Sequence, residues 1–154
     1  MNKILFLITG LLTFTCPVIA DDFMTIDASE NPLFQAIIEP VRVGHGHEQR
    51  STFVINMEDS ATFKLGDDGA DNSTIFVTRS DIPDKDYTVF LDTSVIFAND
   101  ETMGFNRSVQ KLSTRLPLSD GERIRIGGNR MITEQDGVTS EVVTEVWFTL
   151  NKSG

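Results

Sequence analysis

This chain is poor in the residues on which most catalytic and metal centres depend. Its 154 residues include one cysteine, Cys16, and two histidines, His45 and His47. One cysteine excludes an internal disulfide, and it also excludes the cysteine clusters of structural zinc sites. The sequence shows neither a nucleophile elbow nor a carboxylate pair at a recognisable spacing. We therefore expect a protein that is not an enzyme and that carries no cofactor.

Basic residues are also in short supply. The chain has 13 Lys and Arg residues against 23 Asp and Glu residues, which gives a formal net charge of −10. Phosphate binding needs a basic surface, so this balance argues against nucleic acid as a partner. After the first twenty residues no long apolar run follows, and we expect a mature domain that does not span a membrane.

Residues 1–20, MNKILFLITGLLTFTCPVIA, have the pattern of a secretory signal peptide. Lys3 supplies a positive start, residues 4–14 supply an apolar region, and residues 18–20 supply a small-residue cleavage site. The apolar region is shorter than the ~20 residues that span a bilayer. We predict cleavage before Asp21, loss of Cys16 with the signal peptide, and a periplasmic or secreted protein.

The rest of the chain is dominated by short segments with the two-residue alternation of β-strands. No amphipathic helix pattern interrupts them, so we predict an all-β fold, a small antiparallel β-sandwich or partly open barrel of about eight short strands. An acidic lead-in over residues 21–33, ordered only near Leu33, precedes a single β-domain at 34–151. The predicted strands lie near residues 36–43, 51–57, 61–65, 74–79, 87–97, 112–118, 123–126 and 142–150.

Large aromatic residues are spread along these predicted strands. Such side chains bury a large apolar area, so we expect them to pack in the core. They are Phe23, Phe34, Phe53, Phe63, Phe76, Phe90, Phe97, Trp147 and Phe148.

The clearest pattern lies in residues 110–128, QKLSTRLPLSDGERIRIGG. Asp120-Gly121 is a pair that tolerates the positive φ of a tight hairpin turn, and alternating segments flank it. This stretch predicts a β-hairpin whose return strand ends at Gly127-Gly128. The alternating apolar positions are Leu112, Leu116 and Leu118 before the turn, and Ile124 and Ile126 after it.

Basic side chains gather around this predicted hairpin. By alternation Arg115, Arg123 and Arg125 would share its outward face. One interpretation is a solvated face whose arginines pair with acids on neighbouring strands. The other is a docking face for an acidic partner, anionic lipid headgroups or a second copy of the chain. The predicted partner-binding residues are Arg107, Lys111, Arg115, Arg123, Arg125 and Arg130, against only Asp120 and Glu122 in the same window.

The two histidines form a second candidate site, within His45-Gly46-His47-Glu48. Alternate residues of a strand place both imidazoles on one face, which could hold Zn²⁺ or Cu²⁺. A closed site needs further ligands, and the two glycines around His45 favour a turn or loop. An alternative hypothesis for the whole protein is therefore a periplasmic ligand- or metal-binding module that uses the His45/His47 loop.

The order of these segments resembles the conserved β-domain of bacterial secretins, the outer-membrane pore subunits of type II and type III secretion systems and of type IV pilus machines. Residues 61–66, ATFKLG, and 89–95, VFLDTSV, are similar to two of its strands. Residues 114–128, TRLPLSDGERIRIGG, resemble its D-G turn motif ending in I-G-G, and residues 142–150 resemble its final apolar strand. The resemblance covers about residues 50–150.

The chain also departs from the secretin pattern. The segment between its predicted hairpins is too short for a full set of pore-lining strands, and residues 129–138 are polar where the family has a proline-bearing segment. Pro117 would weaken pairing in a continuous barrel strand. The resemblance therefore implies a secretin-like β-fold that is not a pore.

These patterns lead to one functional hypothesis. We expect an exported, non-enzymatic β-domain in the envelope of a Gram-negative-type bacterium that acts by protein–protein interaction. It would be an accessory component of a secretion, pilus or surface-assembly system, and its partner would be another envelope protein or a second copy of itself.

Overall fold

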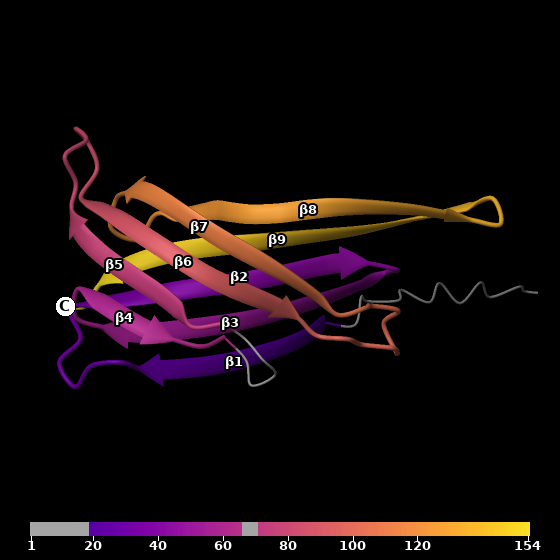
Figure 1. Cartoon of the computed structure of the whole chain (residues 1–154), viewed down its shortest axis with the longest axis horizontal. Coiled ribbons are helices and arrows are strands. Elements are labelled where there is room, and N and C mark those ends of the chain that lie inside the picture. The colour runs from indigo at the N-terminus through magenta and orange to yellow at the C-terminus, as the bar shows by residue number, and fades with distance from the viewer. Residues whose placement is uncertain (1–18, 66–70) are drawn as a thin grey trace, which may run out of the picture.

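The computed structural model describes residues 19–65 and 71–154, and it contains nine β-strands in two sheets (Figure 1). The first sheet has the strand order β1-β3-β2-β9-β8, and the second has the order β4-β5-β6-β7. The strands are β1 (Ile19–Asp27), β2 (Phe34–Gly44), β3 (His47–Met57), β4 (Ser60–Phe63), β5 (Ser73–Arg79), β6 (Tyr87–Phe97), β7 (Ser108–Leu118), β8 (Arg123–Gln135) and β9 (Val138–Lys152).

The prediction of an all-β fold is confirmed, since the described residues form strands and connections without a helix. The two sheets are not closed into a barrel. All pairs within them are antiparallel except β1 with β3, which is parallel. No helix in the described ranges is long and apolar enough to cross a bilayer.

The core lies between the sheets and is built by alternation. In β9, Val146, Phe148 and Leu150 are buried, while the residues between them are more accessible. In β3, Ile55 and Met57 are fully buried on the same face. Because side chains alternate across a strand, each sheet turns one apolar face toward the other and leaves a polar face in water.

Some predicted core aromatics do not lie in the core. Phe63, Phe97 and Phe148 are buried, as expected. Phe76 and Phe90 are 46% and 42% exposed, and their rings lie 6.2 Å apart on the outer face of the second sheet. An aromatic residue in an alternating segment is compatible with either face, so the prediction that these two pack inside was wrong.

The prediction of a hairpin over residues 110–128 is also wrong, because its two strands belong to different sheets. β7 pairs with β6 through residues 108–118, and β8 pairs with β9. The Asp120-Gly121 turn, with φ 73° at Gly121, carries the chain from one sheet to the other. The Gly121 N–H donates to the Leu150 carbonyl at 2.8 Å, which ties this turn to β9.

Packing across the sheets explains why strands β7 and β8 stack instead of pairing. Leu112 and Leu116 of β7 and Ile124 and Ile126 of β8 all pack against the buried core. A Cβ atom added to Gly127 would lie 2.6 Å from Leu112 Cδ2, so β8 approaches β7 closely through this glycine. Stacking buries the apolar faces of both strands against the same core.

The N-terminal prediction differs from the structure at one point. Residues 19–27, of which 21–27 were expected to belong to an irregular lead-in, form strand β1 along β3. Its Ile26 packs against the core. The predicted signal peptide falls outside the described residues except for Ile19 and Ala20, and it stays a prediction.

Candidate functional site

The most prominent surface feature is a two-stranded arm at one end of the sandwich (Figure 1). β2 pairs with β9 only as far as Gly44 opposite Val142, whereas β8 and β9 continue from the Ile132–Glu141 pair to the Gln135–Val138 pair. We call residues 132–141 the arm. Asp136 and Gly137 close it with positive φ angles of 53° and 76°, as expected for a type I′ turn.

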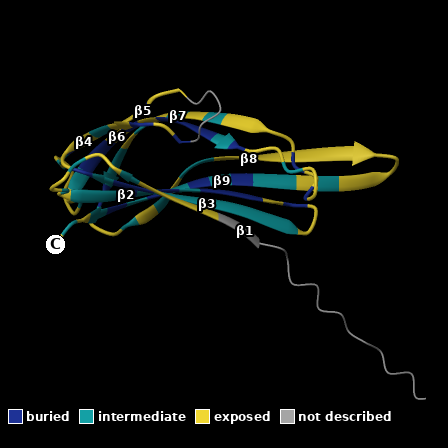
Figure 2. Cartoon of the chain, turned by 90° about the horizontal axis from the view of Figure 1, so that it is seen from below, coloured by how far each residue is buried: buried dark blue, intermediate teal, exposed yellow. Residues whose placement is uncertain are grey.

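The arm exposes apolar side chains. Ile132 is 57% exposed and Val138 is 68% exposed, while Met131 at the base of the arm is 54% exposed. By the strand register Met131 and Val138 continue the core-facing side of the sheet, and Ile132 lies on the opposite side beside Glu141. Figure 2 shows β8 exposed along this projection.

The six predicted partner-binding residues do not form one face. Arg115 and Lys111 project outward from β7 in the second sheet, whereas Arg123, Arg125 and Arg130 project from β8 in the first sheet. Arg107 is exposed just before β7. Since the core lies between the sheets, the shared face predicted for Arg115, Arg123 and Arg125 was wrong, and these side chains point to opposite sides of the sandwich.

The basic side chains of β8 pair with acids on the outer face of their own sheet. Arg130 contacts Glu141 at 2.6 Å and Arg125 contacts Glu145 at 3.3 Å. The Glu141 carboxylate raises the pKa of Arg130 through a hydrogen bond and its charge. These contacts match the interpretation of a solvated sheet face with cross-strand charge pairs.

Arg123 contacts both a carboxylate and an aromatic ring. Its Nε donates to Glu39 Oε2 at 2.8 Å, and its guanidinium lies 4.2 Å from the Trp147 ring. The Trp147 Nε1 donates in turn to Glu145 at 3.0 Å. The indole is therefore covered by a cation and held by a carboxylate, which fixes it on the outside of the sheet.

The basic residues of β7 pair with acids just before and just after strand β5. Lys111 Nζ lies 2.6 Å from Asp71 Oδ2, and this contact lowers the pKa of Asp71 and raises the pKa of Lys111. Arg115 contacts Asp81 at 3.3 Å and lies 5.5 Å from the Phe90 ring. The ion pairs of these β7 and β8 residues hold their charges within the chain. Partner binding by the six residues stays a prediction.

The connection between β7 and β8 holds a pH-sensitive contact. Lys85 Nζ lies 2.7 Å from Glu122 Oε2, which also accepts the Ser119 N–H at 2.8 Å. The Lys85 hydrogen bond, followed by the Ser119 N–H, lowers the pKa of Glu122 below its usual 4.5. In the acid range the unfolded chain therefore binds a proton more readily at Glu122 than the folded chain does.

We expect Glu122→Gln to weaken the acid dependence of stability. The contribution of Glu122 is fully present above pH 4.5 and falls as the pH drops through the lowered folded-state pKa. Urea unfolding between pH 3 and pH 6 should thus show a smaller loss of stability in the variant than in the unchanged protein. Glu134→Gln on the arm is the control for charge removal, and equal pH slopes for all three proteins would contradict the prediction.

The two histidines lie at the turn between β2 and β3. His45 and Gly46 form the turn, with φ angles of 52° and 75°, and His47 begins β3 opposite Gly44. The His45 ring lies 5.9 Å from the Phe105 ring, so it packs against the connection between β6 and β7. Among residues 19–65 and 71–154 no group of three or more His, Cys, Asp or Glu side chains is placed to hold a metal ion. Metal binding at His45 and His47 stays a prediction.

Sequence reasoning missed the arm as a candidate interaction element. The sequence pattern places no strand in residues 129–138, which it describes only as polar. The available signal was that Met131 and Ile132 precede a tight turn and Val138 follows it. These apolar residues on either side of a tight turn indicate a β-hairpin with exposed apolar side chains.

Comparisons with known proteins do not place the chain in a family. Neither a protein-family model nor a curated protein matches it. One solved structure that it resembles is the InvG secretin domain β-barrel from the Salmonella SPI-1 injectisome NC-base, with 12% sequence identity and a TM-score of 0.32. The alignment covers 79% of this chain and 60% of that one. The likeness is weak and concerns the fold alone, and membership of the secretin family stays a prediction.

Proposed function

We propose that this protein is an exported, non-enzymatic β-domain of the cell envelope that acts by binding another protein, and that the arm is its contact element. The observation that carries this proposal is the exposure of Ile132 and Val138 on a ribbon that extends past the third strand of its sheet. The N-terminal pattern of residues 1–20 supports export.

The arm has a physical reason to bind. A two-stranded ribbon in water has at best marginal stability, because it lacks a third strand or a packed face. Within the arm the Thr133 and Ser140 hydroxyls lie 3.1 Å apart, but large apolar side chains remain in solvent. Burying one such side chain against a partner contributes about 1.5–3 kcal/mol. Binding would therefore stabilise the arm and remove Ile132 and Val138 from water.

The charge of the arm and of the whole chain indicates the partner's chemistry. Glu134, Asp136 and Glu141 surround the exposed apolar residues, while Arg130 at the base is paired with Glu141. A second copy would bring together two chains of net charge −10, and their repulsion opposes self-association. The partner that fits best is a different protein with an apolar surface rimmed by basic residues.

The wider role follows from the sequence motif. Residues 114–128 resemble the D-G turn segment of secretins, so we propose an accessory role in a secretion, pilus or surface-assembly system. The motif itself spans the crossover from β7 to β8, directly before the strand that forms one side of the arm.

The test is affinity capture of the tagged protein from crosslinked envelope fractions. Ile132→Lys combined with Val138→Lys should reduce the captured partner by ~10-fold or more, since buried apolar contacts dominate interfaces. The melting temperature should not change, because both positions are exposed. The matched control is Gln135→Lys with Thr139→Lys, which adds the same charge to polar positions of the arm and should retain capture.

Two results would contradict the proposal. One is recovery of the unchanged protein alone, without a partner. The other is full capture by the arm variant together with loss of capture in a variant carrying Arg115→Glu, Arg123→Glu and Arg125→Glu. That second result would move the contact to the basic residues on the two outer faces.

A further inference from the structure

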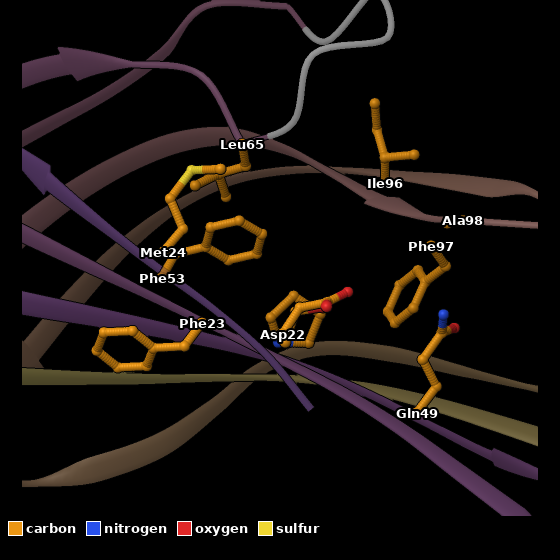
Figure 3. Close-up of a pocket in the computed structure, with 11 residues that line it drawn as sticks. Asp22, Phe23, Met24, Gln49, Phe53, Leu65, Ile96, Phe97 and Ala98 are labelled. Atoms are coloured by element: carbon orange, nitrogen blue, oxygen red, sulfur yellow. The ribbon is translucent and has the colours of Figure 1, made fainter. Parts of the chain in front are cut away.

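A cleft of about 350 Å³ opens between the β1–β3 side of the first sheet and the end of β6 in the second sheet (Figure 3). Its walls are mainly apolar: Met24, Phe53 and Leu65 gather at one end in this view, and Phe97 lies toward the other. Gln49 lies near Phe97 and is one of the few polar residues of the lining. A concave apolar site of this size with few polar groups is typical of a small-molecule site.

A buried arginine lies behind the Gln49 end of the cleft. Arg42 is only 2% exposed, and its Nη2 donates to Gln49 Oε1 at 2.6 Å and to the Ala98 carbonyl. Its guanidinium lies 5.6 Å from the centroid of the Phe97 ring. Arg42 therefore contacts three residues that line the cleft: Gln49, Phe97 and Ala98.

The charge of Arg42 has no ion-pair partner among the described residues. Its other contacts are the Asn106 carbonyl, 2.6 Å from Nη1, and the Phe105 ring. Asp100 is near enough to raise the pKa of Arg42 against the effect of burial, but Asp100 Oδ1 accepts hydrogen bonds from Thr102 and Met103 within its own turn. The buried Nε of Arg42 has no hydrogen-bond partner.

A buried cation without a counter-ion attracts an anion, because the low dielectric screens its charge poorly. The Gln49 amide can transmit this attraction. Its oxygen is held by Arg42, which leaves its N–H donors for a ligand, and no described residue accepts them. The hydrogen bond from Arg42 to Gln49 would polarise the Gln49 amide and strengthen its hydrogen bond to an anion.

We propose that the cleft binds a small anionic amphiphile, a medium-chain carboxylate whose carboxylate group accepts hydrogen bonds from Gln49 in front of Arg42. Its hydrocarbon chain lies along Phe53, Met24 and Leu65. Asp22 also lines the cleft and opposes an anion, but it is an exposed residue of the edge strand β1 and is screened by water. The carboxylate group therefore lies at the arginine end.

The test uses decanoate as the probe, with decanol as its uncharged counterpart, in calorimetric titration of the mature protein. We expect decanoate to bind and to bind more tightly than decanol. Gln49→Glu places a carboxylate next to Arg42 without a change of size, so it should raise the melting temperature and weaken decanoate binding by at least ~10-fold. Asp22→Asn should change decanoate binding little, because water screens the exposed Asp22 carboxylate.

The outcomes are separable. No decanoate binding by the unchanged protein, or equal affinity of Gln49→Glu and the unchanged protein, would overturn the proposal. Equal affinity for decanoate and decanol would show that the cleft takes neutral chains and that Arg42 plays no part. If Gln49→Glu does not fold, the comparison of decanoate with decanol on the unchanged protein decides alone, since equal affinity for the two contradicts the proposed position of the carboxylate.

Discussion

Arg42→Ala is expected to lower the free energy of unfolding by about 3 kcal/mol, the scale for loss of a buried, hydrogen-bonded charged side chain. Arg42 connects β2 of the first sheet to the connection between β6 and β7. It donates to the carbonyls of Ala98 and Asn106 at the two ends of that connection. The guanidinium also lies 4.4 Å from the ring of buried Phe105, so the substitution removes a cation–π contact as well.

Arg42 is one of the contacts that hold the connection between β6 and β7 against the first sheet. Asp100 and Phe105 exchange backbone hydrogen bonds of 2.8 Å, which close the connection on itself. Its attachment to β2 comes from Arg42, with the His45 ring packed on Phe105 beside it. Without the guanidinium, Phe105 would lose one side of its packing and Gln49 would lose the donor that orients its amide.

Chemical denaturation of Arg42→Ala measures this effect, and Arg42→Lys is the informative companion. Lysine keeps the charge but cannot reach Ala98, Asn106 and Gln49 with one planar group. The stability of Arg42→Lys should therefore lie between that of the unchanged protein and that of Arg42→Ala. If Arg42→Ala is within 1 kcal/mol of the unchanged protein, the arginine does not hold the sheets together as described.

Gly128→Ala is expected to destabilise the fold by about 2–3 kcal/mol, the upper range for forced overpacking in a well-packed region. A Cβ atom at this position would lie 2.5 Å from the Thr144 carbonyl oxygen, which belongs to the backbone of β9 and cannot rotate away. Strand β9 would have to separate from β8 just beyond the irregularity between Arg125 and Gly127.

Gly127→Ala is the matched control for this prediction. Its added Cβ would lie 2.6 Å from Leu112 Cδ2, the end of a flexible side chain that can change rotamer. The cost should therefore be smaller, about 1 kcal/mol. Thermal unfolding of both variants tests the difference, and an equal or larger loss for Gly127→Ala would contradict the close approach of Gly128 to β9.

Alternation predicted most strands, because burial of one face is decided by residues two apart. Residues 87–97 form β6 as predicted, and the alternating apolar residues of 142–150 lie inside the longer β9. The same pattern could not show which strands pair. Residues 112–118 and 123–126 alternate around a tight turn, and such segments can pair in one sheet or stack across two.

The candidate site was harder to predict than the fold for the same reason. The charges of Arg115 and Arg123 look continuous in the sequence, but the crossover after Leu118 sends them to opposite faces. The importance of Arg42 could not be found from its neighbours, since its partners Ala98 and Asn106 are more than fifty residues away. Strand β1 was missed because residues 21–31 are acidic and only weakly alternating.

The most direct test of the arm as the contact element is photo-crosslinking in cells from an unnatural residue at position 138. Val138 lies at the tip of the arm, and Phe76 on the outer face of the second sheet is the comparison position. We predict a crosslinked product with a different envelope protein from position 138 and little or none from position 76. A product from position 76 alone, or a product at position 138 that contains only two copies of this chain, would contradict the proposed function.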